Sequence, residues 1–392
     1  MFFFQDDIGL LIQHATYDFW RFLFLPQAEH FAPLLHALTF LEYQLFGLNF
    51  YGYFFVSLFF HFINLFLLYR ILKMLQLPEK LSLAVSMLFF INLTFVEPLL
   101  WFSAQGVILA NIFIALTFFF WLKKSLLLYI FLLAASFSYS TGVGLGIIFG
   151  LIGLIYKKFI PAYFILGILS ILVGPLVATS SLGQITPQFP NRLLNTLQFL
   201  AFVIGGVGRG VFGRLFLPGF EPRHFEIAKT LLSFLPFAAI SALVFSLQKS
   251  SANKFRQLLF SLSLLIVYPY IWAGAIRYQF GIKQALSERY AYPSLYFTVI
   301  LIGVILNYFF AKKILSFYKI IIALISILLI FQTFNFYIKA VEFEKRPLLT
   351  KKYFSDLKKK LEKNDTVPDL PLPSYINQPL TVSDLLPLIS PL

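Results

Sequence analysis

Residues 50–69 read FYGYFFVSLFFHFINLFLLY, a run of twenty residues without a single charged side chain. A helix of about 20 apolar residues is long enough to cross the ~30 Å hydrocarbon core of a bilayer. The run ends at Arg70 and Lys73, and bases in this position are typical of the point where a membrane helix reaches the headgroups. This stretch therefore predicts a membrane span.

The rest of the chain repeats the pattern. Of its 392 residues 59% are hydrophobic and 12% are charged, whereas soluble domains are roughly half apolar and one quarter charged. The absence of cysteine excludes disulfides and thiolate metal sites. We predict an all-α, polytopic transmembrane helical bundle of about ten spans, because nine further apolar runs follow, at 81–96, 106–122, 125–140, 142–156, 160–181, 228–247, 257–274, 291–311 and 318–338.

The net charge of +14 is explained by five short gaps between these runs. Thirteen bases and one acid, Glu79, lie in the gaps and account for +12 of the total. Lysine-rich gaps of this kind are typical of cytoplasmic loops under the positive-inside rule. The charge therefore indicates orientation in a membrane and not a nucleic-acid partner. The bases are Arg70, Lys73, Lys80, Lys123, Lys124, Lys157, Lys158, Lys249, Lys254, Arg256, Lys312, Lys313 and Lys319.

This orientation places the remaining segments on the outer side. Leucines at helical spacing within 31–45 predict an amphipathic helix along the interface. The stretch 193–217 is only partly apolar and contains five glycines, so we expect it to lie on the outer face or to dip into it. We predict a transmembrane domain over 1–338 and an extracytoplasmic tail or small domain over 339–392.

Arginine replaces lysine on the predicted outer side. Guanidinium groups bind phosphate oxygens in a bidentate manner and tolerate partial burial, so such a face suits a lipid-linked phosphate. The alternative is that these arginines reach lipid headgroups or pair with Glu221, Glu226 and Glu288. Before the tail they are Arg21, Arg192, Arg209, Arg214, Arg223, Arg277 and Arg289, with Lys283 as the one lysine.

Two acidic positions are candidates for chemistry. Asp6 and Asp7 follow apolar Phe2–Phe4, and carboxylates so close to hydrocarbon are costly unless they are paired, solvated or functional. One of them could act as a general base, while the structural alternative is an N-cap for the segment that starts at Ile8. Glu97, at the outer end of a predicted span, is a candidate for binding an acceptor or a metal.

Several segments, taken in order, resemble a known family. They are QDDI at 5–8, APLLHAL at 32–38, FGLNFYGY at 46–53, NLTFVEPLLWFSAQGVILA at 92–110 and SERYAYPSLY at 287–296. Together they resemble the GT-C superfamily of multi-pass glycosyltransferases. Within this superfamily they look like the protein O-mannosyltransferases with tetratricopeptide tails and their bacterial relatives. The resemblance covers roughly residues 2–311.

The resemblance implies a cell-membrane enzyme, most readily of a bacterial plasma membrane, with its active site on the extracytoplasmic face. It would transfer a sugar from a polyprenyl-phosphate donor to a glycan or protein acceptor. The catalytic acid of the family corresponds to Asp6 or Asp7, and its second-loop glutamate to Glu97. No cofactor is required, although Asp7 with Glu97 is a candidate pair for a divalent metal. We assign the donor phosphate to Arg277, Arg289 and Tyr290, with Arg192 and Arg209 as further candidates.

The chain departs from the family pattern at three points. A transmembrane helix precedes the acid in the family, and Phe2–Phe4 look like its outer end, so we expect an apolar helix upstream of Met1. Ala32 replaces a basic residue before Pro33, and Tyr139-Ser140 stands where relatives carry Lys-Glu. The rival functions are a lipid-linked glycan polymerase, a flippase or transporter, and a membrane scaffold. Ionisable residues concentrated at span ends favour surface chemistry over transport.

Overall fold

The computed structural model describes residues 3, 6–26, 31–177, 192–216, 253–311, 318–363, 367–373 and 380–389. Within these ranges the chain is almost entirely helical, and the one β-type contact is a bridge between Pro371 and Thr381. This confirms the predicted all-α class.

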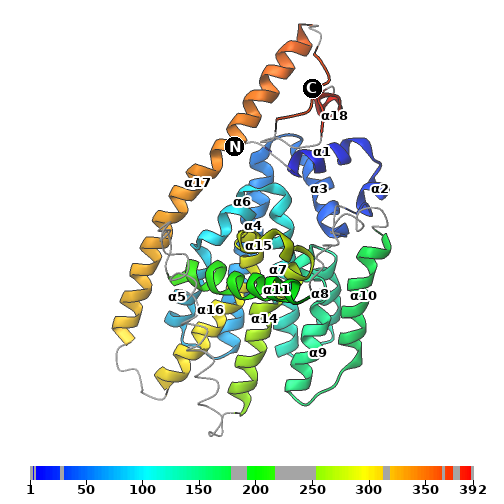
Figure 1. The fold of residues 1–392 in the computed structure, drawn as a ribbon. Helices are drawn as coiled ribbons and strands as arrows, with labels where there is room; N and C mark the ends of the chain where they lie inside the picture. The colour runs from blue at the N-terminus through cyan, green and yellow to red at the C-terminus, as the bar shows by residue number, and fades with distance from the viewer. Residues whose placement is uncertain are drawn as a thin grey trace.

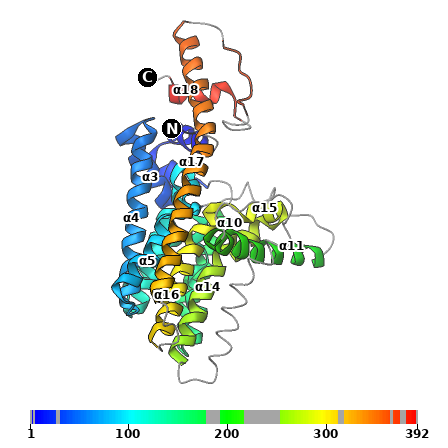
Figure 2. The ribbon, with the colours of Figure 1, turned by 90° about the vertical axis from the view of Figure 1, so that its left-hand side faces the viewer.

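Upright helices form the body of the molecule (Figures 1 and 2). Three pairs of sequence neighbours, α4 with α5, α7 with α8 and α9 with α10, are joined by connections of four or five residues, and connections this short favour antiparallel packing. Nine of the ten predicted runs overlap these helices, with bounds that differ by several residues, and 228–247 lies outside the described residues. The helices are α4 (Phe50–Met74), α5 (Glu79–Phe90), α7 (Gln105–Leu122), α8 (Leu127–Ser136), α9 (Leu145–Ile155), α10 (Pro161–Val177), α14 (Asn253–Arg277), α16 (Glu288–Ala311) and α17 (Tyr318–Glu362).

Six helices of the described chain are long and apolar enough to cross a membrane. Five are upright and contain α4, α7, α14, α16 and α17, whereas α5, α8, α9 and α10 are shorter. The sixth, Leu194–Gly213, joins α11 (Arg192–Gly205) to the π-helix η5 (Gly206–Gly213). In both views α11 lies crosswise to the upright helices, so its composition alone does not make it a crossing (Figures 1 and 2).

Three turns at the lysine-rich end share one geometry. Gln76, Lys124 and Lys157 follow α4, α7 and α9, and each has a left-handed backbone with φ between 55° and 61°. In each turn the next residue donates its N–H back to the carbonyl five residues earlier, at 2.8–3.1 Å. This is the Schellman arrangement, in which glycine is the usual left-handed residue. Here two of the three positions carry a lysine instead, where a cation also suits the negative end of the helix dipole.

A helix, α3 (Pro33–Phe46), is present where 31–45 predicts one, but several of its polar side chains face the protein. Leu35, Thr39 and Glu42 are buried, whereas Leu41 is 59% and Leu45 74% exposed. Helical spacing alone cannot tell which face meets protein and which meets lipid. A leucine face turned outward is what an apolar surrounding would favour.

A second, smaller core lies at the end of the molecule that holds both termini (Figure 1). Apolar residues of α1 (Asp6–Thr16) pack there with the upper end of α17 and with α18 (Val382–Ile389). We call α18 and the part of α17 beyond Lys339 the cap. The predicted domain boundary at 338/339 falls inside α17, which continues as one helix into the cap. The main members of this core are Phe3, Ile8, Leu10, Leu11, Phe22, Phe50, Tyr53, Phe102, Leu357, Leu385 and Leu388.

Candidate functional site

The site begins where α6 (Val96–Leu100) meets the start of α16. The Glu97 carboxylate accepts the backbone N–H of Glu288 at 2.6 Å, and the Glu288 carboxylate accepts the backbone N–H of Glu97 at 2.8 Å. The Ser287 hydroxyl donates to the same Glu97 carboxylate, at 2.8 and 2.9 Å from its two oxygens. Each glutamate thus caps the other's helix, because the first N–H groups of a helix have no partner within it.

Arg289 follows directly and projects beside this pair. Its Nε lies 3.7 Å from Glu97 Oε1, which is an ion-pair distance but too long for a hydrogen bond. The guanidinium carbon lies 5.1 Å from the centre of the Trp101 ring, within the range of a cation–π contact. Arg289 Nε is buried and has no hydrogen-bond acceptor among the described residues. A donor is therefore left open at the centre of the site.

Arg277 and Arg289 converge on one oxygen. Gln284 lies on the short helix α15 (Gly281–Ala285), between the two arginines in sequence. With its amide oriented by these neighbours, its side-chain oxygen accepts from Arg277 Nη1 and from Arg289 Nη2, at 3.2 Å each. Two cations thus share one neutral acceptor.

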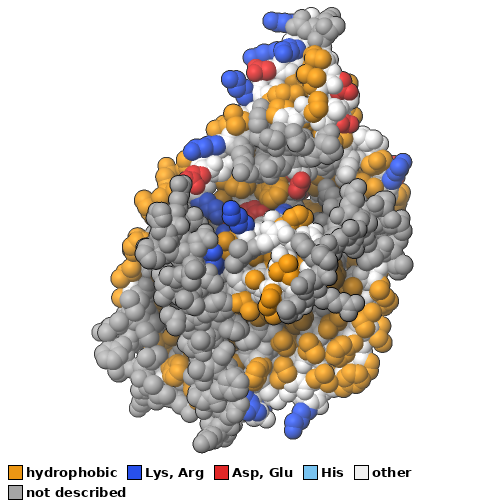
Figure 3. Space-filling view, in the orientation of Figure 1, with side chains coloured by type: hydrophobic (Ala, Val, Ile, Leu, Met, Phe, Trp, Pro, Cys, Tyr) orange, Lys and Arg blue, Asp and Glu red, His pale blue; other side chains and the backbone are white. Residues whose placement is uncertain are grey.

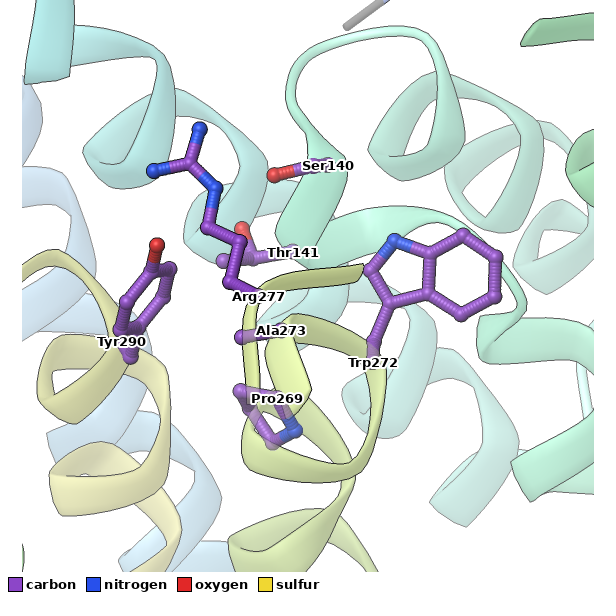
Figure 4. A pocket seen from close by; sticks show the side chains of 7 residues that line it. All are labelled: Ser140, Thr141, Pro269, Trp272, Ala273, Arg277 and Tyr290. Atoms are coloured by element: carbon purple, nitrogen blue, oxygen red, sulfur yellow. The ribbon is translucent and has the colours of Figure 1, made fainter. Parts of the chain in front are cut away.

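A narrow pocket adjoins Arg277 (Figure 4). The guanidinium extends between the Tyr290 hydroxyl and Ser140. Thr141 Oγ1 and Trp272 Nε1 are buried, without hydrogen-bond partners in the part of the chain that the structure describes. The volume of about 10 Å³ is room for about one water. The lining residues are Ser140, Thr141, Pro269, Trp272, Ala273, Arg277 and Tyr290.

The residues that stand where relatives carry Lys-Glu border this site. Ser140 lines the pocket. Burial raises the pKa of the neighbouring Tyr139 to about 12, although the charge of Arg289 acts in the opposite direction. Tyr139 therefore lies close enough to Arg289 for the positive charge of Arg289 to affect its pKa.

The two aspartates have different surroundings. Asp7 is fully buried, and its Oδ1 accepts the backbone N–H of Ser103 at 2.7 Å. Asp6 is exposed at the start of α1. Burial lowers the pKa of Arg277, and the negative charge of Asp6 opposes this shift in part. Asp7 thus ties α1 to the segment before α7, whereas Asp6 is close enough to Arg277 and Arg289 to contribute to their electrostatics.

Glu288 is the centre of a second ionic group. It lies 3.9 Å from Arg214 Nη2 and pairs with Lys339 of α17. Arg214 Nη2 also donates to the Leu286 carbonyl at 2.6 Å. Lys339 was expected in a separate tail, and the sequence carries no signal of this long-range pair. Figure 3 shows basic and acidic side chains gathered at this level, between the cap and the hydrophobic lower part of the molecule.

The π-helix η5 packs closely against α14. A Cβ added at Gly206 would lie 2.3 Å from the Tyr270 ring, and one at Gly210 would lie 2.5 Å from the Tyr270 hydroxyl. These glycines therefore allow η5 to approach the helix that ends in Arg277. Single π-helical turns are frequent at functional sites.

The remaining predicted residues are not drawn into this group. Arg209 is half-buried on η5, and no ion pair joins it to the other described residues. Arg192 begins α11, but its side chain lies outside the described residues, as do Glu221, Arg223 and Glu226. The Glu97 carboxylate, a candidate for a metal or an acceptor, is engaged by Ser287 and Glu288. Across the described ranges, no three His, Asp or Glu side chains come together as a metal site requires.

No family model, no curated protein and no solved structure matches this chain.

Proposed function

We propose that the chain is a membrane glycosyltransferase that transfers a sugar from a polyprenyl-phosphate donor to an extracytoplasmic glycan or protein acceptor. The observation that carries the proposal is the convergence of Arg277 and Arg289 on the single oxygen of Gln284. Two neighbouring guanidinium groups repel one another, and an anion between them relieves this cost. A phosphate oxygen is the natural replacement for the amide oxygen.

The electrostatics of Arg277 support an anion at this position. Burial lowers the pKa of its guanidinium, and the nearby positive charge of Arg289 lowers it further. Tyr290 and the charge of Asp6 act in the opposite direction. A bound phosphate would stabilise the charged form of both arginines. The open Nε donor of Arg289 would also gain an acceptor.

The depth of the site suits a lipid substrate. Arg277 is the last residue of α14, a helix whose apolar part qualifies as a membrane span. Ile271, one and a half turns earlier, is an exposed apolar residue. A polyprenyl chain could remain in the hydrocarbon beside α14 while its phosphate reaches the arginines at the helix end.

The reaction we propose is a single displacement with inversion at the anomeric carbon. Asp6 takes the proton of the acceptor hydroxyl while the acceptor oxygen forms a bond to the anomeric carbon. The bond from the carbon to the phosphate oxygen breaks, and its electron pair leaves with the polyprenyl phosphate. Arg277 and Arg289 stabilise the charge that develops on this leaving group. Asp7 holds α1, and therefore Asp6, in place.

The test is sugar transfer by the full chain in proteoliposomes, with radiolabelled polyprenyl-phosphate sugars and an acceptor panel of peptides and glycans. We expect labelled acceptor and free polyprenyl phosphate to appear in equal amounts. Donor that crosses the bilayer uncleaved would identify a flippase instead. If no sugar is transferred and no donor binds in a saturable manner, the proposal is contradicted.

A further inference from the structure

A second pocket lies at the opposite end of α14 from Arg277. It is formed where the end of α9 meets the start of α14 and has a volume of about 420 Å³. About 30 Å of helix separates Arg256 from Arg277, so this pocket is distinct from the candidate active site. Its lining residues are Ile155, Lys157, Asn253, Arg256, Gln257 and Phe260.

The local fold brings two cations to the pocket. Lys157 is the left-handed residue of the turn after α9, and Arg256 lies in the first turn of α14. Gln257 Nε2 donates to the Ile155 carbonyl at 2.9 Å and so holds α14 against the end of α9. Arg256 Nη2 donates to Asn253 Oδ1 at 3.1 Å. No carboxylate pairs with either cation in the described part of the chain.

One wall of the pocket is apolar. Phe260 lines it one turn further along α14 and is 42% exposed. Leu154 and Phe159, on either side of the α9 turn, are exposed as well. A free inorganic anion would gain nothing from such a wall. A ligand with a charged head and a hydrocarbon tail would use both parts.

We propose that this pocket binds the phosphate headgroup of an anionic membrane phospholipid from the lysine-rich leaflet. The Arg256 guanidinium offers a bidentate fork to the phosphate, and Lys157 supplies a second positive charge. The positive end of the α14 dipole favours an anion at the same place. The acyl chains lie along Phe260. Basic pockets between membrane helices on the cytoplasmic side are suited to such headgroups.

The experiment uses the purified full chain in detergent and titrates short-chain phosphatidylglycerol, phosphatidylcholine or inorganic phosphate, with bound ligand counted by native mass spectrometry. We expect saturable phosphatidylglycerol binding that exceeds phosphatidylcholine binding by about tenfold, the scale of charge-assisted hydrogen bonds. Millimolar inorganic phosphate should leave it unchanged. Equal binding of the two lipids would overturn the proposal. If inorganic phosphate displaces phosphatidylglycerol efficiently, the pocket binds free phosphate and the proposal of a lipid ligand is wrong.

Variants separate the pocket from general attraction to the basic surface. In the double variant Lys157→Gln, Arg256→Gln we expect phosphatidylglycerol affinity to fall about tenfold. The matched control, Lys80→Gln with Lys124→Gln, removes two charges at the same end but outside the pocket and should change affinity less than twofold. Arg256→Lys keeps the charge but loses the fork, and should give an intermediate loss. Equal losses in pocket and control variants would contradict a specific site.

Discussion

Glu97 and Glu288 exchange hydrogen bonds across 191 residues of sequence, each carboxylate accepting the other's backbone N–H. The exchange fixes α6 against the first turn of α16. It also sets the position of Arg289, because that residue follows Glu288 directly and lies at ion-pair distance from Glu97. The geometry of the candidate phosphate site therefore depends on these two acids.

We expect Glu97→Ala to lower the free energy of unfolding by about 1–3 kcal/mol, because it leaves the Glu288 N–H and the Ser287 hydroxyl without their acceptor. Glu97→Gln should cost less, since one side-chain oxygen remains. Thermal unfolding in detergent measures both. Glu79→Gln, an exposed acid at the other end of the bundle, is the control and should unfold like the unmodified chain. An unchanged midpoint for Glu97→Ala would show that the exchange contributes nothing to stability.

The different surroundings of Asp6 and Asp7 predict different consequences. Asp6→Asn should reduce sugar transfer by about 10²-fold or more, because amide nitrogen and oxygen cannot replace the base, and should leave the unfolding midpoint unchanged. Asp7→Ala should lower stability by about 1–3 kcal/mol through loss of the Ser103 contact. Asp18→Asn is a suitable control for transfer, since its role is to cap α2 (Phe19–Leu23) and asparagine caps equally well. Full activity of Asp6→Asn would remove it from the mechanism.

Gln284 offers a direct test of the anion site. Gln284→Glu has nearly the same shape but places a negative charge between Arg277 and Arg289. It should compete with the donor phosphate and weaken donor binding by about tenfold, the scale of one charge-assisted hydrogen bond. Gln284→Ala, which removes the resident oxygen without adding charge, should not weaken it. Calorimetric titration with a short-chain polyprenyl phosphate measures both, and equal affinities would place the phosphate elsewhere.

Glu42 predicts a pH dependence of stability. Its burial raises its pKa to about 8, opposed in part by the hydrogen bond that Gln105 Nε2 donates to its Oε1 at 2.8 Å. In the folded state the Glu42 carboxyl therefore keeps its proton up to about pH 8, whereas in the unfolded state it loses the proton near pH 4.5. The free energy of unfolding should fall as the pH rises from about 4.5 to about 8, and level off above that.

Glu42→Gln should flatten this dependence, because the amide has no proton to lose. Denaturant unfolding of the full chain at pH 5, 6, 7 and 8 gives the two slopes, and Glu79→Gln controls for removal of an acid. The same slope in the unmodified chain and in Glu42→Gln would show that Glu42 does not hold the proton.

The left-handed turn residues predict a stabilising substitution. Gln76 has φ of 61°, where a side chain is strained and glycine is not. Gln76→Gly should raise the free energy of unfolding by about 0.5–1 kcal/mol, whereas Gln76→Ala should not raise it. Thermal unfolding of the two variants measures the difference. A destabilised glycine variant would mean that the Gln76 side chain makes a contact worth more than the strain.

The sequence was most informative about the upright helices, because a run such as 50–69 has one physical explanation and a basic gap marks its end. It was less informative about α3, since periodicity identifies two faces but not which of them meets the protein. It could not assign different roles to Asp6 and Asp7, because their difference in burial depends on the packing of α1 against other segments. The meetings of Glu97 with Glu288 and of Lys339 with Glu288 join distant segments, and no local pattern records them. Ten spans were expected, and six helices of the described chain are long enough.

The length of α17 has a mechanical consequence. Its 45 residues correspond to roughly 68 Å of helix, more than twice the ~30 Å hydrocarbon thickness. Its first half is long enough to cross the bilayer, and its second half extends into the cap. Between the two, Lys339 forms an ion pair with Glu288. Beyond Lys339, Pro347 has no backbone N–H and so cannot donate a hydrogen bond within α17. A change in the tilt of α17 in a thicker or thinner membrane would therefore act on the Lys339–Glu288 pair.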